Sequence, residues 1–298
     1  MRRKFLWGVG VLVAAVAIVV GWAWWTIGQI AVERVSDDLY MMTGIGGNVA
    51  VLVTNEGVVV VDTMTFARQG EAIRARIREI TDKPVVAVIN THYHRDHTHG
   101  NPAFPVGTKV IATDNTLKHL RERDADYWRD APARDLLPND TFGDSRDLNI
   151  GGKAIRLFHP GRGHTDGDLV VEFVADRVIH TGDLLFNGRY PNIDLDGGGS
   201  VREWDGTLAA VLTHDFDRAI PGHGALSDRA GLQRFQEFMR TLWTETRKVV
   251  DRGGSLEDAQ RSVDLSRFDM HRLWFAPQLN QDFVIKRAYE EASGKRLP

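Results

Sequence analysis

The segment Thr91–Asn101, THYHRDHTHGN, places three histidines and one aspartate within six residues, directly after the apolar run VVAVI. That run predicts a strand buried on both faces. Side chains two residues apart on an extended chain point the same way, so His92, His94 and Asp96 can converge. His97 can join them if the chain turns there. Imidazole and carboxylate at this density are ligands that zinc favours. The segment therefore predicts a metal site at a strand end.

Three further candidate ligands lie later in the chain, each close to glycine. They are His164 in GRGHTDGD, Asp183 in HTGDLLF and His223 in PGHG. Ligands on glycine-rich loops at strand ends are how layered α/β proteins build a site. A lone histidine or aspartate beside glycine is more often a turn residue. Seven candidates in one repeated pattern favour a shared metal centre.

The ordered motifs HxHxDH, GHTxGD, TGD and PGHG resemble those of the metallo-β-lactamase-fold hydrolases, from about Val35 to the C-terminal helices. The resemblance implies two metal ions, each held by three residues, and one carboxylate that bridges them. The first set is His92, His94 and His164, the second is Asp96, His97 and His223, and the bridge is Asp183. Two Zn²⁺ per chain are expected, with iron as the alternative metal.

The periodicity of the chain past Glu33 predicts an α/β protein. Paired strands are expected at Val49–Val53 and Val58–Asp62, and a helix at Ala67–Ile80. Further strands are expected at Val85–Ile89, Lys109–Ala112, Ala154–Phe158, Leu169–Val174 and Arg177–His180, helices at Asn115–Arg129, Val201–His214 and Gly231–Asp251, and irregular chain over Ala131–Asn149. Two strand-rich halves with helices between them fit a four-layer αββα sandwich, so residues 33–298 are expected to form one metallo-β-lactamase-fold catalytic domain.

Residues 1–32 are expected to form a separate N-terminal transmembrane helix. Three basic residues precede an uncharged stretch from Phe5 to Val32, and crossing a bilayer takes about 20 apolar residues. Trp22, Trp24 and Trp25 suit a membrane interface. A cleavable signal peptide is the alternative. With the basic start in the cytoplasm, the catalytic domain would lie in the bacterial periplasm, anchored to the inner membrane or released after cleavage.

Composition narrows the substrate and the ligand types. The chain has no cysteine, so disulfides and thiolate ligands are excluded. This also excludes the lactamase subclasses whose second metal takes a cysteine. A formal net charge of −3 argues against nucleic acid, which needs a basic surface. The expected partner is a small-molecule substrate.

The expected chemistry is hydrolysis by a metal-bound hydroxide, because two divalent ions can lower the pKa of shared water to about 7. The bond would be an ester, lactone, thioester or amide, with β-lactams among the candidates. We expect Asp96 to orient the hydroxide and Tyr190, in FNGRYPNID, to stabilise an oxyanion, with the Asn187 amide as an alternative. Arg95, between two ligands, is expected to point to solvent or to a partner carboxylate.

Two other functional classes stay open. The first is an iron-dependent enzyme like the persulfide dioxygenases, which would use the same ligand set. The second is a catalytically silent envelope binding module. All seven ligand positions are filled, which speaks against the silent module. The all-His/Asp set resembles one lactamase subclass, whereas the bridging Asp183 resembles thioesterase-like and lactonase-like members.

Overall fold

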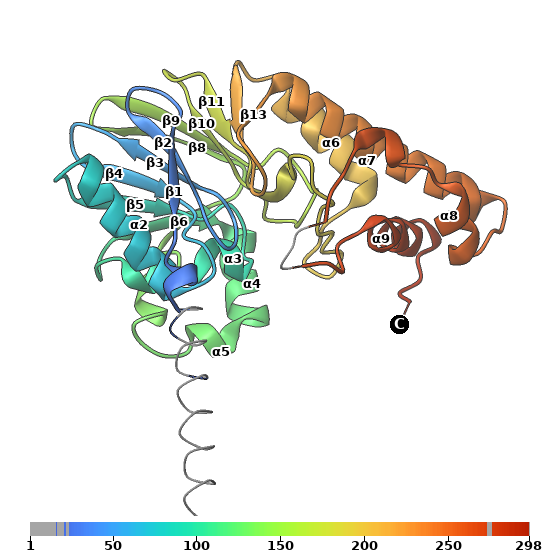
Figure 1. The fold of residues 1–298 in the computed structure, drawn as a ribbon, viewed down its shortest axis with the longest axis horizontal. Coiled ribbons are helices and arrows are strands. Elements are labelled where there is room, and N and C mark those ends of the chain that lie inside the picture. Colours follow the sequence, from blue (N-terminus) through green and yellow to red (C-terminus); the bar gives the residue numbers. More distant parts are fainter. Residues whose placement is uncertain (1–15, 17–20, 22–23, 273–275, 298) are drawn as a thin grey trace, which may run out of the picture.

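The computed structural model describes residues 16, 21, 24–272 and 276–297. In this part of the chain two β-sheets pack face to face, and helices cover both outer faces (Figure 1). Side chains from both sheets meet in a central core, where Leu39, Val61 and Val171 are fully buried. The expected αββα sandwich is confirmed.

The first sheet has seven strands that lie in sequence order. They are β1 (Ala31–Arg34), β2 (Leu39–Thr43), β3 (Val49–Val53), β4 (Val58–Val61), β5 (Val85–Ile89), β6 (Lys109–Thr113) and β7 (Asp140–Phe142). Strands β1 to β4 pair antiparallel, whereas β4 to β7 pair parallel. Parallel strands end at the same edge of a sheet, so the chain that follows β4 and β5 emerges side by side.

The second sheet has six strands in the order β13-β12-β11-β10-β9-β8. They are β8 (Ser145–Ile150), β9 (Lys153–Phe158), β10 (Val170–Phe173), β11 (Val178–His180), β12 (Arg218–Ile220) and β13 (Ser227–Asp228). Strands β11 and β12 are its parallel pair. Asp183 follows β11 and His223 follows β12, so the parallel pairing brings these two residues to one edge.

Helices form the two outer layers. The helices on the side of the first sheet are α2 (Ala67–Ile80), α4 (Asp114–Arg123) and α5 (Ala125–Trp128). Those on the side of the second sheet are α6 (Val201–Val211), α7 (Arg229–Asp251), α8 (Leu256–Ser262) and α9 (Gln281–Ser293). The connections contain the short helices α3 (Arg95–Thr98), η1 (Asn101–Ala103), η2 (Arg134–Leu136), η3 (Gly182–Leu184) and η4 (Ser266–Phe268). Helix α2 buries Ile73 and Ile77 against the outer face of the first sheet. Helix α7 buries its apolar stripe, including Leu232 and Phe235, against the second.

Two expectations about the middle of the chain were wrong. The helix expected at Asn115–Arg129 is two helices, α4 and α5, with a break at Asp124, whose backbone leaves the helical region. The chain expected to be irregular over Ala131–Asn149 contains η2, β7 and most of β8. Strand β8 alternates exposed and half-buried residues at the sheet edge, so it has no apolar run that a sequence reading would recognise.

The expected membrane helix falls mainly on residues outside those described. Among the described residues, no helix combines the length and the apolarity needed to cross a membrane. The uncharged stretch also extends into the first sheet, because Ala31 and Val32 pair with Thr43 and Met42 in β1 and β2.

Candidate metal centre

All seven predicted ligands follow the ends of strands or lie in loops between strands. His92 and His94 follow β5, Asp96 and His97 lie in α3, His164 lies between β9 and β10, Asp183 lies in η3 after β11, and His223 follows β12. Because the two sheets face each other, these loops meet at one edge of the sandwich (Figure 1).

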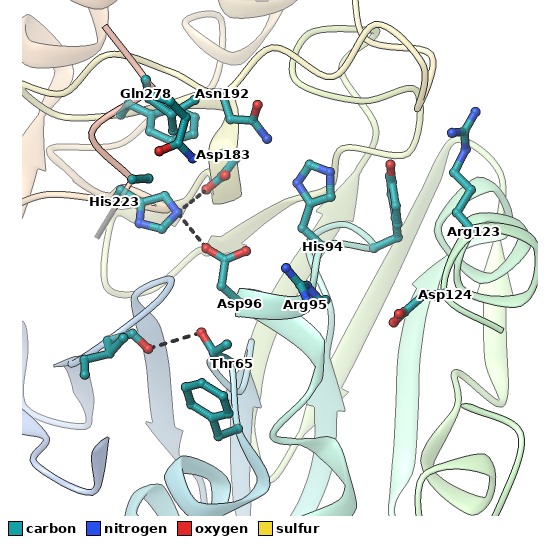
Figure 2. A pocket seen from close by; sticks show the side chains of 16 residues that line it. Thr65, His94, Arg95, Asp96, Arg123, Asp124, Asp183, Asn192, His223 and Gln278 are labelled. Atoms are coloured by element: carbon teal, nitrogen blue, oxygen red, sulfur yellow. Dashed lines mark hydrogen bonds and ion pairs between the residues drawn. The ribbon is translucent and has the colours of Figure 1, made fainter. Parts of the chain in front are cut away.

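The ligands form two adjoining clusters, and in each cluster the potential donor atoms lie within 4.8 Å of one another. The first cluster contains His92, His94, His164 and Asp183, and the second contains Asp96, His97 and His223. This grouping agrees with the two ligand sets that the resemblance implied. Figure 2 shows Asp96, Asp183 and His223 converging across the cavity.

Asp183 lies between the clusters and presents one carboxylate oxygen to each. Its Oδ2 lies 3.5 Å from His164 Nε2 and 3.8 Å from His92 Nε2. Its Oδ1 lies 3.2 Å from His97 Nε2 and 3.5 Å from His223 Nε2. One carboxylate can therefore contribute to both clusters at once, which is the geometry of a bridging ligand.

Three buried polar atoms at the centre of the clusters have no hydrogen-bond partner among the described residues. They are His92 Nε2, His97 Nε2 and Asp183 Oδ1. Leaving a buried polar atom unpaired costs about 1–3 kcal/mol, so proteins rarely tolerate several together. Imidazole nitrogens and carboxylate oxygens are also good ligand atoms for a divalent cation, and a bound metal would give each of these atoms a partner. The residues present therefore fit a two-metal centre.

Hydrogen bonds from outside the clusters set the orientation of three of these histidine rings. Nδ1 of His97 donates to Asp62 Oδ2 over 2.7 Å, and Nδ1 of His164 donates to the Asn192 carbonyl over 2.9 Å. Nδ1 of His92 lies 3.1 Å from the Thr91 hydroxyl. Protonation at Nδ1 leaves each Nε2 lone pair free to bind a cation.

His94 uses its ring nitrogens in the opposite sense. Its Nε2 donates to Asp194 Oδ2 over 3.0 Å, and its Nδ1 lies 2.8 Å from His164 Nε2. Asp194 also accepts hydrogen bonds from the Tyr93 hydroxyl and from Gly197 N. Asp194 therefore fixes the tautomer in which Nδ1 is the ligand atom of His94.

The electrostatics of the first cluster favour neutral imidazoles. Burial lowers the pKa of His164 to about 4, and burial together with the neighbouring His97 and His164 lowers the pKa of His92 well below its usual value. Burial alone would raise the pKa of Asp183, but the surrounding histidines hold it well below its usual value. Neutral histidines and an ionised carboxylate are the protonation states that metal binding requires.

Two glycines allow the backbone to approach the ligands closely. A Cβ at Gly47 would overlap the imidazole of His97, with 2.6 Å to Nε2, and a Cβ at Gly222 would overlap the Asp183 carboxylate. Any larger residue at either position would displace a ligand. The Gly-Gly turn after β2 and the PGHG loop are therefore part of the architecture of the site.

The clusters open into a cavity of about 820 Å³. Its lining includes Asp96, Asp183, His94 and His223 from the clusters, the apolar residues Ile45, Phe66, Phe186, Ala276 and Leu279, and the polar residues Thr65, Tyr93, Arg95, Arg123, Asp124, Asn192 and Gln278 (Figure 2). The cavity is wide enough for a small-molecule substrate.

Tyr190 and Asn187 are not among the described residues that line this cavity. Tyr190 N donates to the His271 carbonyl, and His271 N donates to the Gly188 carbonyl, so this segment is paired with the C-terminal chain. The Tyr190 ring consequently lies near Phe238 in the core against the second sheet. The Asn187 amide donates to the Ala225 carbonyl. Neither group is therefore among the described residues that line the cavity beside the clusters.

Sequence reasoning missed the two carboxylates that hold ligand histidines. The sequence does contain a local indication that Asp62 lies near the site, since this residue directly follows the four-valine strand β4, which pairs with β5. Its φ of 63° is unusual for a residue other than glycine and turns its side chain toward Thr91 and His97. Asp194 had no local signal, because it lies in an irregular loop far along the chain from His94.

Comparisons with known proteins agree with this site. A family model described as the metallo-beta-lactamase superfamily matches residues 42–223. The chain is 25% identical over 218 residues to a metallo-beta-lactamase type 2 of Elizabethkingia meningoseptica, covering 69% of this chain and 83% of that protein. It is 23% identical over 226 residues to a linear primary-alkylsulfatase of Pseudomonas sp. (strain ATCC 19151), covering 62% of this chain but 42% of that protein.

A solved structure supports the same fold. The metallo-beta-lactamase from Pontibacter korlensis superposes with a TM-score of 0.62 at 21% identity, covering 71% of this chain and 99% of that chain. At this identity the match supports the fold and leaves the substrate open.

Proposed function

Because this chain belongs to the metallo-β-lactamase superfamily, we propose that it is a hydrolase that holds two zinc ions and cleaves an ester, lactone, thioester or amide bond in a small molecule. The observation that carries the proposal is the position of Asp183. One of its oxygens faces each cluster, at 3.5 Å from His164 Nε2 and 3.2 Å from His97 Nε2. A carboxylate placed between two sets of histidines is suited to hold two cations at once.

Two divalent cations supply, when bound, activation of water at neutral pH and polarisation of the bond to be cleaved. His92, His94 and His164 would hold the first cation, and Asp183 would be shared. The second would be held by Asp96, His97 and His223. Within the chain itself, Asp62 and Asp194 accept hydrogen bonds from the rings of His97 and His94 and so orient these two ligands.

Asp96 is the ligand with the clearest second role. Its Oδ2 lies 3.1 Å from His223 Nε2 and 3.8 Å from His97 Nε2, whereas its side chain keeps 30% of its surface exposed to the cavity. The second oxygen, Oδ1, can accept a hydrogen bond from a water in the cavity. Asp96 would thereby orient the attacking water and accept its proton.

The metal is tested by elemental analysis of the purified full-length protein. Two zinc ions per chain are expected, and the content should fall to about one when the second cluster is disrupted by His223→Ala. A single bound iron would instead favour the iron-dependent oxygenase class. A protein that takes up no transition metal would exclude both enzymes.

The substrate is tested with a panel that separates the bond types. Nitrocefin, an acyl-homoserine lactone, an acyl thioester and a phosphodiester are incubated with the zinc-loaded protein, with the Asp183→Asn variant as the matched control. Turnover of a carbonyl substrate that is lost in the variant supports the proposal. Turnover of the phosphodiester alone would replace it with a different hydrolase class.

We further propose that the catalytic domain lies on the outer side of a bacterial inner membrane. The proposal is supported by the basic start and uncharged stretch of the sequence and by two exposed tryptophans next to the domain. Trp24 is 57% and Trp25 is 59% exposed, and the guanidinium of Arg68 lies 5.4 Å from the Trp24 ring. Protease added to intact spheroplasts should degrade the domain; full protection would place it in the cytoplasm.

A further inference from the structure

Arg95 lies inside the ligand segment and lines the cavity. It is the first residue of α3, between the cluster residues His94 and Asp96, and Figure 2 shows its side chain beside both of them. Among the described residues, its guanidinium makes no hydrogen bond, ion pair or ring contact. Arg95 is exposed, which agrees with the expectation that it points to solvent, and it has no carboxylate partner in this part of the chain.

The other charged groups of the cavity already have partners. Asp96 and Asp183 face the histidines of the clusters. Asp124 accepts hydrogen bonds from His99 Nε2 over 2.6 Å and from Trp128 Nε1 over 2.8 Å. Arg123, the second cation of the lining, donates to His119 Nδ1 and to the Asp196 carbonyl. Arg95 is thus the charged side chain of the described lining that has neither a hydrogen-bond partner nor an ion-pair partner.

We propose that Arg95 binds an anionic group of the substrate, a carboxylate or a sulfonate, and so selects substrates that carry one negative charge near the bond to be cleaved. The identity of the bond that is cleaved rests on the proposed hydrolase function, whereas the anion site does not depend on that function. A guanidinium suits this role because its planar fork can donate two parallel hydrogen bonds to such a group.

The other residues that line the cavity indicate the chemical character of the rest of the substrate. Ile45, Phe66, Phe186 and Leu279 form apolar walls, and Phe66 is 42% exposed although it is a large apolar side chain. An exposed apolar wall beside an unpaired cation fits an amphiphilic ligand. The substrate class is therefore an apolar acyl compound with one anionic substituent.

The anion site is tested first without metal or turnover. The full-length protein, stripped of metal with EDTA, is titrated with 4-phenylbutyrate, with 3-phenylpropane-1-sulfonate and with neutral 4-phenylbutyramide, and heat release gives each Kd. Both anions should bind more tightly than the amide. Arg95→Gln should weaken the binding of the preferred anion by about tenfold, and Arg95→Lys by less, since charge-assisted hydrogen bonds are the stronger ones.

Arg121→Gln is the matched control. Arg121 lies on α4, is exposed, and is not among the residues that line the cavity. This variant should bind both anions like the unchanged protein. The inference is overturned if Arg95→Gln binds both anions as tightly as the control does, or if the unchanged protein does not distinguish the anions from the amide.

Turnover gives a second, independent readout. The zinc-loaded protein is compared on the mono-4-nitrophenyl ester of glutaric acid and on neutral 4-nitrophenyl valerate. Arg95→Gln should lower kcat/KM by about tenfold more for the anionic ester than for the neutral ester. An equal loss on both esters overturns the inference. Hydrolysis of neither ester by the unchanged protein counts against the proposed function, and the titration then decides the role of Arg95 alone.

Discussion

Replacing Asp194 by Asn should weaken one of the two metal sites and leave the other intact. The Asn carbonyl can still accept the hydrogen bond from Gly197 N, which now spans 2.9 Å to Asp194 Oδ1. Its amide nitrogen, however, would face His94 Nε2 at the position of the present 3.0 Å bond. The amide nitrogen and a protonated Nε2 are both donors and cannot form a hydrogen bond with each other. The ring of His94 would therefore carry its proton on Nδ1 instead of Nε2.

That shift removes the ligand atom. Nδ1 of His94 lies 2.8 Å from His164 Nε2 and points into the first cluster, and a protonated Nδ1 has no lone pair for a cation. Loss of such an outer hydrogen bond typically costs 10- to 100-fold in metal affinity, or about 1.4–2.8 kcal/mol. The second cluster has no atom bonded to Asp194, so its affinity should stay unchanged.

The assay is competition for zinc between the metal-free protein and a chromogenic chelator, which resolves the two binding constants. Tyr93→Phe is the matched control, because Tyr93 donates to the same oxygen of Asp194 but belongs to neither cluster. Phe at this position should leave both constants unchanged. The reasoning is refuted if Asp194→Asn binds zinc like the unchanged protein, or if Tyr93→Phe loses as much affinity as Asp194→Asn.

Three further predictions concern the same centre. Asp96→Asn should retain the fold, as seen by circular dichroism, but lower kcat by about 10²-fold or more, since it removes the proton acceptor; unchanged kcat would remove that role. Gly47→Ala should lower the zinc content from two ions to one, because the new methyl overlaps the His97 ring; elemental analysis of the variant tests this. Burial lowers the pKa of His223, but the charges of Asp183 and Asp96 raise it to about 9. Because this exceeds the ordinary value of 6.5, the protonated ring stabilises the metal-free protein at lower pH, and the melting temperature should fall as pH rises through about 9; a melting temperature that rises across this range would contradict the assignment.

The sequence was most informative where a residue's role depends on its neighbours along the chain. The apolar runs predicted β3, β4 and β5 to within one residue, because buried strands need consecutive apolar side chains. The seven ligands could also be predicted from their neighbours along the chain, since each lies in a short motif next to a strand or a glycine-rich turn. Their convergence also follows from parallel strand pairing, which brings loop ends to one edge.

The sequence was least informative where a role depends on tertiary contacts. Asp194 is an ordinary loop aspartate until the fold brings it within 3.0 Å of His94, a hundred residues earlier. Tyr190 was predicted to stabilise an oxyanion because it follows Asp183 along the chain, but its backbone pairs with His271 and it is not among the described residues that line the cavity. The edge strand β8 and the break at Asp124 likewise depend on neighbours that no local pattern encodes.

The cavity lining extends along the chain beyond the part that holds the metal ligands. All seven ligands lie within residues 42–223, the part that the family model matches. Ala276, Gln278 and Leu279 line the cavity from the segment between η4 and α9, beyond that match. The backbone of His271, which also lies beyond that match, forms hydrogen bonds with Gly188 and Tyr190 in the chain that follows Asp183. The chemistry of the family's metal centre can therefore occur beside a cavity wall that the family match does not include, which is why the cavity lining, and not the relatives' substrates, should direct the search for a substrate.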